Sequence, residues 1–270
     1  MEKRIVDGST RLFGIVGDPI TQVQTPQLMT GLFQAQGVNA LLLPFQVAAE
    51  HFETTLRGLM GLSNLDGLVI TVPHKVRACG LVNSLSPRAQ QVGAINVMRP
   101  LPDGTWAGDI FDGEGLVRGM ERQGFAITGK RIKQLGAGGG GSAVAVALAA
   151  AGAAVISLCD PQPSLAQELA ARINRFYPRR PAEATADGVG TEGYDLLVNC
   201  SPVGMRPGDG MPAPFGDFAP SLGVVDIIMH PEETPLLAHA RRCGCRAMNG
   251  RPMIEGQLEA FSDFFGIRRS

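Results

Sequence analysis

A ten-residue stretch that is half glycine constrains the fold of this chain more than any other segment. Within it, Gly136, Gly138 and Gly141 have the spacing G-x-G-x-x-G. Glycines spaced in this way let the backbone approach a pyrophosphate at the N-terminus of a helix, provided that a strand precedes them and a helix follows. The flanking residues predict both elements, a strand over residues 131–135 and a helix over residues 142–151. The stretch therefore indicates a dinucleotide-binding α/β domain.

The alternative is a flexible glycine linker. Linkers are typically rich in serine, whereas here an unbroken run of Ala, Val and Leu follows over residues 143–151. One observation disagrees with the predicted strand, because Lys133 and Gln134 are unusually polar for a central parallel strand.

Composition excludes several classes of function. A chain of 270 residues, 44% of them hydrophobic, is long enough for two α/β domains with a buried core. The formal net charge of −1 and the lack of a basic stripe argue against nucleic acid or an anionic membrane as a partner. The first seven residues lack the apolar core of a signal peptide, and residues 143–151 are too few to span a bilayer. We expect a cytoplasmic protein, either a monomer or a homodimer.

The cysteine pattern is typical of a reducing compartment. The number of cysteines, five, is odd, which indicates free thiols. Cys243 and Cys245 have no second pair at the spacing of a zinc site, and the four histidines are scattered. We therefore expect no metal ion.

Strands and helices alternate along the chain with short connections. This order predicts a largely parallel sheet in the first half, and the alternation restarts at residue 131. The pairs Thr25-Pro26 and Ser86-Pro87 each predict an N-cap followed by a first-turn proline. The expected strands cover residues 12–16, 39–45, 65–72, 95–99, 105–108, 131–135, 155–160, 196–199, 224–228 and 246–248. The expected helices cover residues 26–36, 48–59, 112–123, 142–151, 164–176, 235–242 and 253–265, with a short one after Pro87.

Asp160 indicates which nucleotide is bound. It ends the second predicted strand of the dinucleotide domain, where an acidic residue accepts hydrogen bonds from the adenosine ribose. A carboxylate there repels a 2′-phosphate, and no arginine lies between Asp160 and Ala171 to bind one. The sequence predicts NAD, with NADP less favoured. The alternative interpretation is an aspartate that caps the next helix.

Eight motifs occur in order along the chain. They are G-I-V-G-D-P-I (14–20), I-T-V-P-H-K (70–75), G-A-I-N (93–96), G-D-I-F-D-G (108–113), G-A-G-G (136–139), N-C-S-P-V-G-M (199–205), T-P-L-L (234–237) and G-R-P-M-I-E-G-Q (250–257). Together they resemble the shikimate dehydrogenase family, including its quinate members, over essentially the whole chain.

The resemblance implies a reversible hydride transfer between a nicotinamide and a ring secondary alcohol of a small cyclic hydroxy acid. It also implies a substrate-binding domain of residues 1–111 and 250–270, a Rossmann domain of residues 112–249, and an active-site cleft between them.

The family's motifs assign roles to individual residues. Lys75 of T-V-P-x-K and Asp112 of G-D-x-x-D-G match the catalytic pair. Oxidising an alcohol requires a base to take its proton as the hydride leaves, and either member of the pair can hold that proton. Thr71, Asn96 and Gln257 match substrate ligands. The implied cofactor contacts are Gly136, Ala137, Gly138, Gly139, Gly140, Asp160, Ser201 and Gly250.

Departures from the family cluster on the sides of the site that face the substrate carboxylate and the nicotinamide. The family's S-x-S-P is here V-Q-T-P, so that Val23 replaces a serine and only Thr25 keeps a hydroxyl. Met229 replaces the usual tyrosine ahead of T-P-L-L, and Ile110-Phe111 replaces an asparagine-threonine pair. Because a site built to hydrogen-bond a group discriminates through it by on the order of 10⁴-fold, we expect shikimate to be a poor substrate.

The motifs argue against two other classes of protein. A non-catalytic sensor of NAD or of a pathway ligand has no need of Lys75 and Asp112. Another two-domain dehydrogenase, such as the methylenetetrahydrofolate type, is disfavoured by the motifs at residues 71–75 and 108–113.

Overall fold

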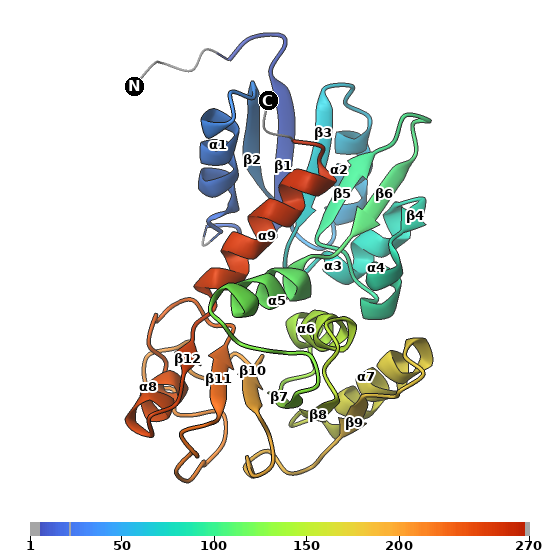
Figure 1. Cartoon of the computed structure of the whole chain (residues 1–270). Helices are drawn as coiled ribbons and strands as arrows, with labels where there is room; N and C mark the ends of the chain where they lie inside the picture. The colour runs from blue at the N-terminus through green and yellow to red at the C-terminus, as the bar shows by residue number, and fades with distance from the viewer. Residues whose placement is uncertain (1–5, 22, 268–270) are drawn as a thin grey trace. The chain divides into compact units, whose positions relative to one another are not determined.

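The computed structural model describes residues 6–21 and 23–267 (Figure 1). Residues 1–5, on which part of the argument against a signal peptide rests, lie outside the described residues. The chain forms two compact units, which we call the N-terminal unit (Met1–Phe111 with Leu258–Ser270) and the central unit (Asp112–Gln257). Their boundary falls inside helix α9 (Arg251–Phe264), whereas we expected the returning segment to begin at residue 250. None of the described helices is long and apolar enough to cross a membrane.

The N-terminal unit is built on a six-stranded sheet with the order β2-β1-β3-β5-β6-β4. Only β5 runs antiparallel to its neighbours, because a short turn that contains Gly104 joins it to β6, and such a turn cannot link parallel strands. The sheet is therefore largely parallel, as predicted. The strands are β1 (Arg11–Gly17), β2 (Ala40–Gln46), β3 (Leu65–Ile70), β4 (Ser84–Leu85), β5 (Val97–Pro100) and β6 (Trp106–Asp109).

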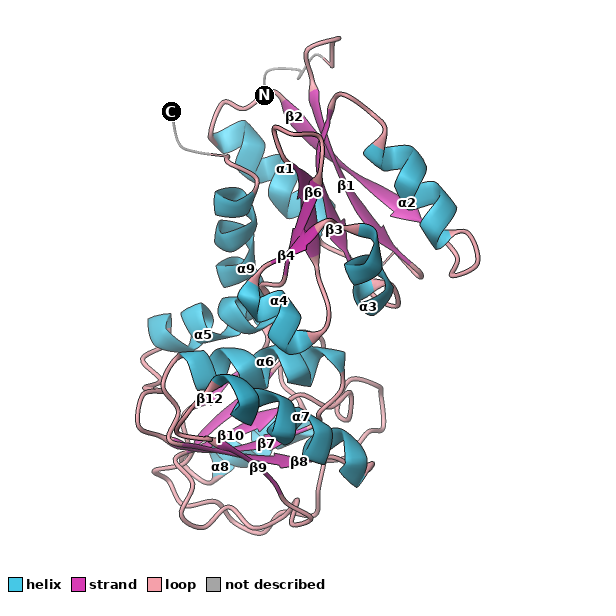
Figure 2. Ribbon diagram, turned by 90° about the vertical axis from the view of Figure 1, so that its right-hand side faces the viewer, coloured by secondary structure: helices cyan, strands magenta, loops and turns pink. Residues whose placement is uncertain are grey.

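Helices cover both faces of this sheet (Figure 2). On one face, Phe13 of β1 packs against Phe33 of α1 and Phe265, which follows α9, in a single apolar core. The opposite face is covered by α2, whose Phe52 and Leu56 are fully buried. The helices are α1 (Thr25–Ala35), α2 (Phe52–Met60), α3 (Lys75–Ala78) and α4 (Pro87–Val92), with a 3₁₀ turn η1 (Cys79–Leu81).

The two predicted N-caps have different outcomes. Ser86 caps α4 as expected, since its hydroxyl accepts a hydrogen bond from the Ala89 N–H at 3.1 Å. Thr25 does not cap α1; it is the first helical residue, and the N-cap is Gln24, which makes no side-chain cap bond. The prediction was wrong by one residue because proline is tolerated throughout the first turn, where backbone N–H groups have no helical partner.

The central unit contains a second six-stranded sheet, in which every strand pair is parallel. Its order, β12-β11-β10-β7-β8-β9, is that of the Rossmann fold, which binds ligands at the carboxyl ends of the strands where the order reverses. That point lies between β7 and β10. The strands are β7 (Arg131–Leu135), β8 (Val155–Cys159), β9 (Ala182–Ala184), β10 (Leu196–Asn199), β11 (Gly223–Asp226) and β12 (Ala247–Met248).

Helices α6 and α7 cover one face of this sheet and α8 covers the other (Figure 2). Helix α6 begins at Gly139, three residues earlier than predicted, because glycines themselves form its first turn after the extended N-cap Gly138. The helices of this unit are α5 (Asp112–Arg122), α6 (Gly139–Ala150), α7 (Pro163–Phe176) and α8 (Pro235–Arg242), with the first turns of α9.

The polar residues of β7 bind the loops around the strand. The Gln134 amide nitrogen donates to the carbonyls of Gly136 and Gly141, each at 2.9 Å, and so holds the glycine loop closed. On the other face, the Lys133 ammonium donates to the Gly190 carbonyl at 2.5 Å. The Lys133 ammonium and the Gln134 amide nitrogen thus both have partners, which is why these two polar residues can be fully buried in a central strand.

Candidate active site

In the N-terminal unit, the predicted lysine lies at the carboxyl edge of the sheet. Lys75 is the first residue of α3, close to the end of β3, and its carbonyl accepts a hydrogen bond from the Ile95 N–H at 3.0 Å. Thr71 continues the line of β3, with its N–H donating to the Val16 carbonyl at 2.9 Å. Backbone bonds thus bring Thr71, Lys75 and the Ile95–Asn96 segment to one edge of the sheet.

His74 anchors the segment that carries Lys75, a role that sequence reasoning missed. Its ring is fully buried, stacks on Phe52 with centroids 4.1 Å apart, and lies 2.7 Å from the Val47 carbonyl through Nε2. The histidine is part of the T-V-P-H-K motif. Nothing in the motif indicates that His74 is buried while the nearby Val72 is exposed, because this depends on how the segment packs.

Asn96 organises the backbone that leads toward Asp112. Its amide is 2% exposed, and its oxygen accepts a hydrogen bond from the Phe111 N–H at 3.0 Å. The Phe111 ring, which stands where the family has a threonine, is 4% exposed and packs edge-on against Phe261 and Phe264. The aromatic substitution therefore extends the apolar core of this unit.

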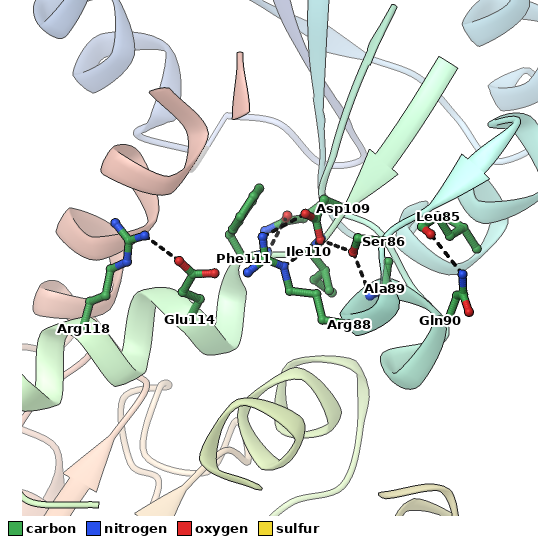
Figure 3. A network of polar contacts seen from close by, with 11 residues as sticks. Leu85, Ser86, Arg88, Ala89, Gln90, Asp109, Ile110, Phe111, Glu114 and Arg118 are labelled. Atoms are coloured by element: carbon green, nitrogen blue, oxygen red, sulfur yellow. Dashed lines mark hydrogen bonds and ion pairs between the residues drawn. The ribbon is translucent and has the colours of Figure 1, made fainter. Parts of the chain in front are cut away.

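An ion pair between a half-exposed arginine and a buried aspartate holds the same backbone (Figure 3). Arg88 donates to Asp109 through two nitrogens, at 2.7 and 2.8 Å, and its guanidinium lies 4.1 Å from the centroid of the Phe111 ring. The Ser86 hydroxyl and the Ile110 N–H also donate to the Asp109 carboxylate. Sequence reasoning missed this network, although Asp109 lies within the G-D-I-F-D-G motif.

The residues expected near a substrate carboxylate offer few polar groups. Val23 packs against the same apolar cluster as Phe111, and Thr25 is half-buried at the start of α1. Met229, in the central unit, is half-buried in the loop that follows β11. Of the three side chains only Thr25 can donate a hydrogen bond to a carboxylate.

The central unit joins two of the predicted site residues directly. The Gln257 amide nitrogen of α9 donates to the Asp112 carboxylate at the start of α5, and both side chains are buried. Glycines allow the two helices to come this close. A Cβ on Gly115 would lie 2.5 Å from the Met253 carbonyl oxygen, and one on Gly256 would lie 2.5 Å from that of Gly115.

The glycine loop divides into residues that pack and residues that face open space. A Cβ on Gly136 would lie 2.9 Å from the Cys200 backbone, and one on Gly141 would lie 2.2 Å from the Gly136 oxygen. No atom lies within 4 Å of a Cβ built on Gly138 or Gly139, at the start of α6. This is the division that a pyrophosphate site requires, because the open positions leave the helix N-terminus accessible to an anion.

Asp160 ends β8 beside this loop, as predicted. One carboxylate oxygen accepts a hydrogen bond from the Ala137 N–H at 2.8 Å and the other from the Gln162 N–H at 2.9 Å. The N-cap of α7 is Gln162, so the alternative interpretation of Asp160 as a helix cap was wrong. Each oxygen has a second lone pair with which it could accept a hydroxyl hydrogen.

A buried carboxylate links the loops that follow β10 and β11. Asp226 accepts hydrogen bonds from the Asn199 amide at 3.1 Å, the Ile228 N–H at 3.1 Å and the Thr234 hydroxyl at 2.8 Å. Burial raises the pKa of Asp226 above its ordinary value. Asn199 in turn accepts from the Ser201 hydroxyl at 2.7 Å, which orders the loop that carries this predicted cofactor contact.

Gly250 is required by packing at the same edge. Its N–H donates to the Ile228 carbonyl at 2.9 Å, and a Cβ there would lie 2.1 Å from the Ile227 oxygen.

Sequence reasoning missed the buried Asp226, although an acidic residue directly after the apolar pair Val224-Val225 was a usable signal.

Comparison with known proteins agrees with this architecture. A family model described as the shikimate dehydrogenase substrate binding domain matches residues 15–98. A shikimate dehydrogenase (NADP(+)) from Rubrobacter xylanophilus is 35% identical over 267 residues, which cover 97% of this chain and 93% of that protein.

Two solved structures share the fold over nearly their whole length. A shikimate 5-dehydrogenase from Listeria monocytogenes, in complex with shikimate and NAD, is 26% identical with a TM-score of 0.91, covering 100% of this chain and 96% of its own. The ligand-free 5-ketofructose reductase of a Gluconobacter species is 27% identical with a TM-score of 0.88, covering 96% and 94%. Since a curated relative is 35% identical across nearly all of both chains, the protein belongs to the shikimate dehydrogenase family.

Proposed function

We propose that the protein is an NAD(P)-dependent dehydrogenase that interconverts a secondary alcohol on a small polyhydroxylated ring and the corresponding ketone. The observation that carries this proposal is the contact of Asp112 with Gln257, two residues that match the family's site and that lie 145 positions apart in the chain. A glutamine that binds a buried carboxylate fixes its direction, as a proton-transferring group requires.

The reaction divides between cofactor and protein. The nicotinamide, when bound, accepts the hydride from the alcohol carbon. The hydroxyl proton passes to the protein, and we assign its transfer to Lys75 and Asp112 as a coupled pair. Thr71, Asn96 and Gln257 are proposed to bind or orient the ring hydroxyls. By the same reasoning the N-terminal unit binds the substrate and the central unit binds the cofactor.

We further propose that the substrate is held weakly, or not at all, through a carboxylate. Val23 and Met229 cannot replace the hydrogen bonds of the serine and tyrosine that the family uses, and Val23 packs on an apolar core. One solved structure with the same fold is a 5-ketofructose reductase, so this fold also occurs in an enzyme that is not named for shikimate or quinate. A neutral cyclic polyol or keto sugar therefore joins shikimate and quinate as a candidate.

For the cofactor we propose NAD in preference to NADP. The Asp160 carboxylate lies next to the glycine loop, where it would repel a 2′-phosphate. Two unit charges about 4 Å apart repel by about 4 kcal/mol at an effective dielectric constant of 20. Solvent screening lowers this value, so we expect NAD to be preferred by about 10- to 100-fold, or about 1.4–2.8 kcal/mol. The relative from Rubrobacter xylanophilus is described as an NADP(+) enzyme, so a preference for NAD would distinguish this protein from it.

The test measures the change in NAD(P)H absorbance with a panel of shikimate, quinate and neutral cyclic polyols. We expect turnover that Lys75→Ala and Asp112→Asn each reduce by at least about 10²-fold, the usual contribution of general acid–base catalysis. Lys130→Ala is the matched control, because Lys130 makes only a half-exposed ion pair with Asp195. Binding of a panel member without turnover in the unmodified protein would instead identify a sensor.

The weak binding of a substrate carboxylate and the preference for NAD are tested by separate substitutions. The double substitution Val23→Ser with Met229→Tyr is expected to raise kcat/KM for shikimate and to leave that for a neutral polyol unchanged. Asp160→Ser is expected to shift the NAD to NADP preference by at least about tenfold toward NADP. Shikimate turnover by the unmodified protein as efficient as its best neutral substrate would refute the first argument, and an NADP preference would refute the second.

A further inference from the structure

A second cluster of reactive side chains lies in the central unit, outside the motifs that point to the dehydrogenase. His239 near the end of α8 and Cys243 just after it are four residues apart, so their side chains point to the same side of the helix. Asp217, in the loop that precedes β11, completes the cluster. The thiol sulfur lies 3.7 Å from His239 Nε2 and 4.0 Å from an Asp217 carboxylate oxygen.

These separations match the coordination shell of a tetrahedral metal ion. Zinc binds thiolate sulfur at about 2.3 Å and imidazole nitrogen or carboxylate oxygen at about 2.0 Å. Ligands at these distances and at tetrahedral angles lie about 3.5 Å from one another. All three candidate atoms here lie within 4.8 Å of one another, so one ion could contact all of them once the His239 ring turns away from its present hydrogen-bond partner.

The surroundings of the cluster suit an ion with one open coordination position. The same three side chains, with Phe218 and Arg242, line a pocket of about 410 Å³. The Phe218 N–H donates a hydrogen bond to the Cys243 sulfur at 3.4 Å, a contact that stabilises a metal-bound thiolate. The Phe218 ring also packs edge-on against the His239 ring, with centroids 4.8 Å apart, and restricts its rotation.

We propose that Asp217, His239 and Cys243 bind a zinc ion or a similar divalent metal ion, with water from the pocket as the fourth ligand. A thiolate, an imidazole and a carboxylate are the ligands that zinc uses, and their two negative charges balance the ion. The spacing of cysteines in the sequence argued against a metal because it compares only neighbouring positions. The carboxylate ligand comes from a separate loop.

Metal binding exchanges contacts of the metal-free protein. His239 Nε2 now lies 2.9 Å from the Gly216 carbonyl, and Arg242 lies 3.3 Å from Nδ1. When Nε2 binds the ion, its hydrogen moves to Nδ1 by way of solvent and the exposed Arg242 turns away. The Cys243 thiol releases its proton to solvent, so binding is coupled to proton release.

The site would attach the loop before β11 to the end of α8. The opposite end of α8, at Thr234, is the one that contacts the Asp226 network. The ion would therefore stabilise the Rossmann domain from the side away from the residues proposed to bind cofactor, and we expect it to leave kcat unchanged.

The experiment titrates the chelator-treated 270-residue chain with Co²⁺ and with Zn²⁺. We expect one equivalent of Co²⁺ to produce a thiolate-to-cobalt charge-transfer band, and Zn²⁺ to abolish it. Cys243→Ser removes the band, and Asp217→Asn weakens Zn²⁺ binding in calorimetry by about tenfold or more. Cys245→Ser is the matched control, since its thiol donates to the Ala219 carbonyl and is not part of the cluster.

A second readout tests whether the ion stabilises the fold. The same concentration of Zn²⁺ is expected to raise the Tm of the unmodified protein and of Cys245→Ser, and to raise that of Asp217→Asn by less, because the weaker site stabilises the fold less. Asp217 is exposed, so its replacement keeps the fold intact. An absent charge-transfer band, a band that persists in Cys243→Ser, or Zn²⁺ binding of equal strength in both Asp217→Asn and the unmodified protein would each overturn the proposal.

Discussion

Replacing Asp226 by alanine is expected to destabilise the central unit by about 3 kcal/mol or more. The carboxylate is fully buried and accepts hydrogen bonds from Asn199, Ile228 and Thr234. Each buried donor left without a partner costs about 1–3 kcal/mol. Three donors would lose their partner, which together costs about 3–9 kcal/mol. The lower end of this range applies because the Asn199 amide keeps a contact with the Val203 carbonyl at 3.4 Å.

The substitution Asp226→Asn separates shape from charge. Its oxygen can still accept from Asn199 and Ile228, which share one carboxylate oxygen, and its amide can donate to the Thr234 hydroxyl in a reversed bond. We expect a loss of less than about 1 kcal/mol.

The comparison of these two proteins also predicts a pH dependence. Burial raises the pKa of Asp226 above its ordinary value of 3.8, so folding favours the protonated acid. The stability that Asp226 contributes is complete below pH 3.8 and is lost as the pH rises through the raised pKa. Across that window Asp226→Asn should gain stability relative to the unmodified protein, and it should keep that gain at higher pH.

Thermal unfolding followed by far-ultraviolet circular dichroism measures both effects. The single tryptophan, Trp106, lies in the N-terminal unit and would report on that unit alone. A loss of 3 kcal/mol corresponds to a decrease in Tm of about 6–12 °C for a domain of this size. The exposed Glu192→Ala serves as the control. A decrease below about 2 °C for Asp226→Ala, or an Asp226→Asn protein that loses relative stability as the pH rises, would refute the reasoning.

Further substitutions test the glycine loop and the ion pair between Arg88 and Asp109. Gly141→Ala is expected to lower the Tm, because its Cβ would lie 2.2 Å from the Gly136 carbonyl oxygen; Gly138→Ala, with no atom within 4 Å, should leave the Tm unchanged and raise the KM for the cofactor. An equal Tm for both alanine variants would contradict this division of the loop. Gln134→Leu removes two hydrogen bonds to the loop, and we expect a higher KM for the cofactor together with a lower Tm. Arg88→Lys loses the two-nitrogen contact with Asp109 and the stacking on Phe111. We expect unfolding followed by Trp106 fluorescence to show that the N-terminal unit is less stable by about 1–2 kcal/mol. An unchanged unfolding transition would show that this half-exposed ion pair contributes little to stability.

Local sequence was sufficient for most of the secondary structure and for the glycine loop. The strands Arg131–Leu135 and Leu196–Asn199 and the helix Pro235–Arg242 match the predicted ranges without a shift. Glycine, aspartate or proline stands at one end of each segment and fixes that boundary. Asp160 was placed beside the glycine loop by chain order alone, since a strand, loop, helix and strand in a Rossmann domain leave only one edge for it.

The contacts between distant parts of the chain required the tertiary structure. The polar Gln134 in a central strand was a contradiction in the sequence and became a loop-binding residue once its two carbonyl partners were visible. Phe111, which the motif comparison placed near the substrate, is a residue of the apolar core.

What the sequence by itself determined is the order of elements, the place of the nucleotide loop and the family, because these depend on periodicity and on motifs of neighbouring residues. Only the tertiary structure decided which side chains meet. Gln257 binds Asp112, Asp226 joins two loops, and Asp217 reaches a histidine and a cysteine on another element. Such contacts depend on how helices and strands pack, and packing is set by the whole chain rather than by any one stretch of it.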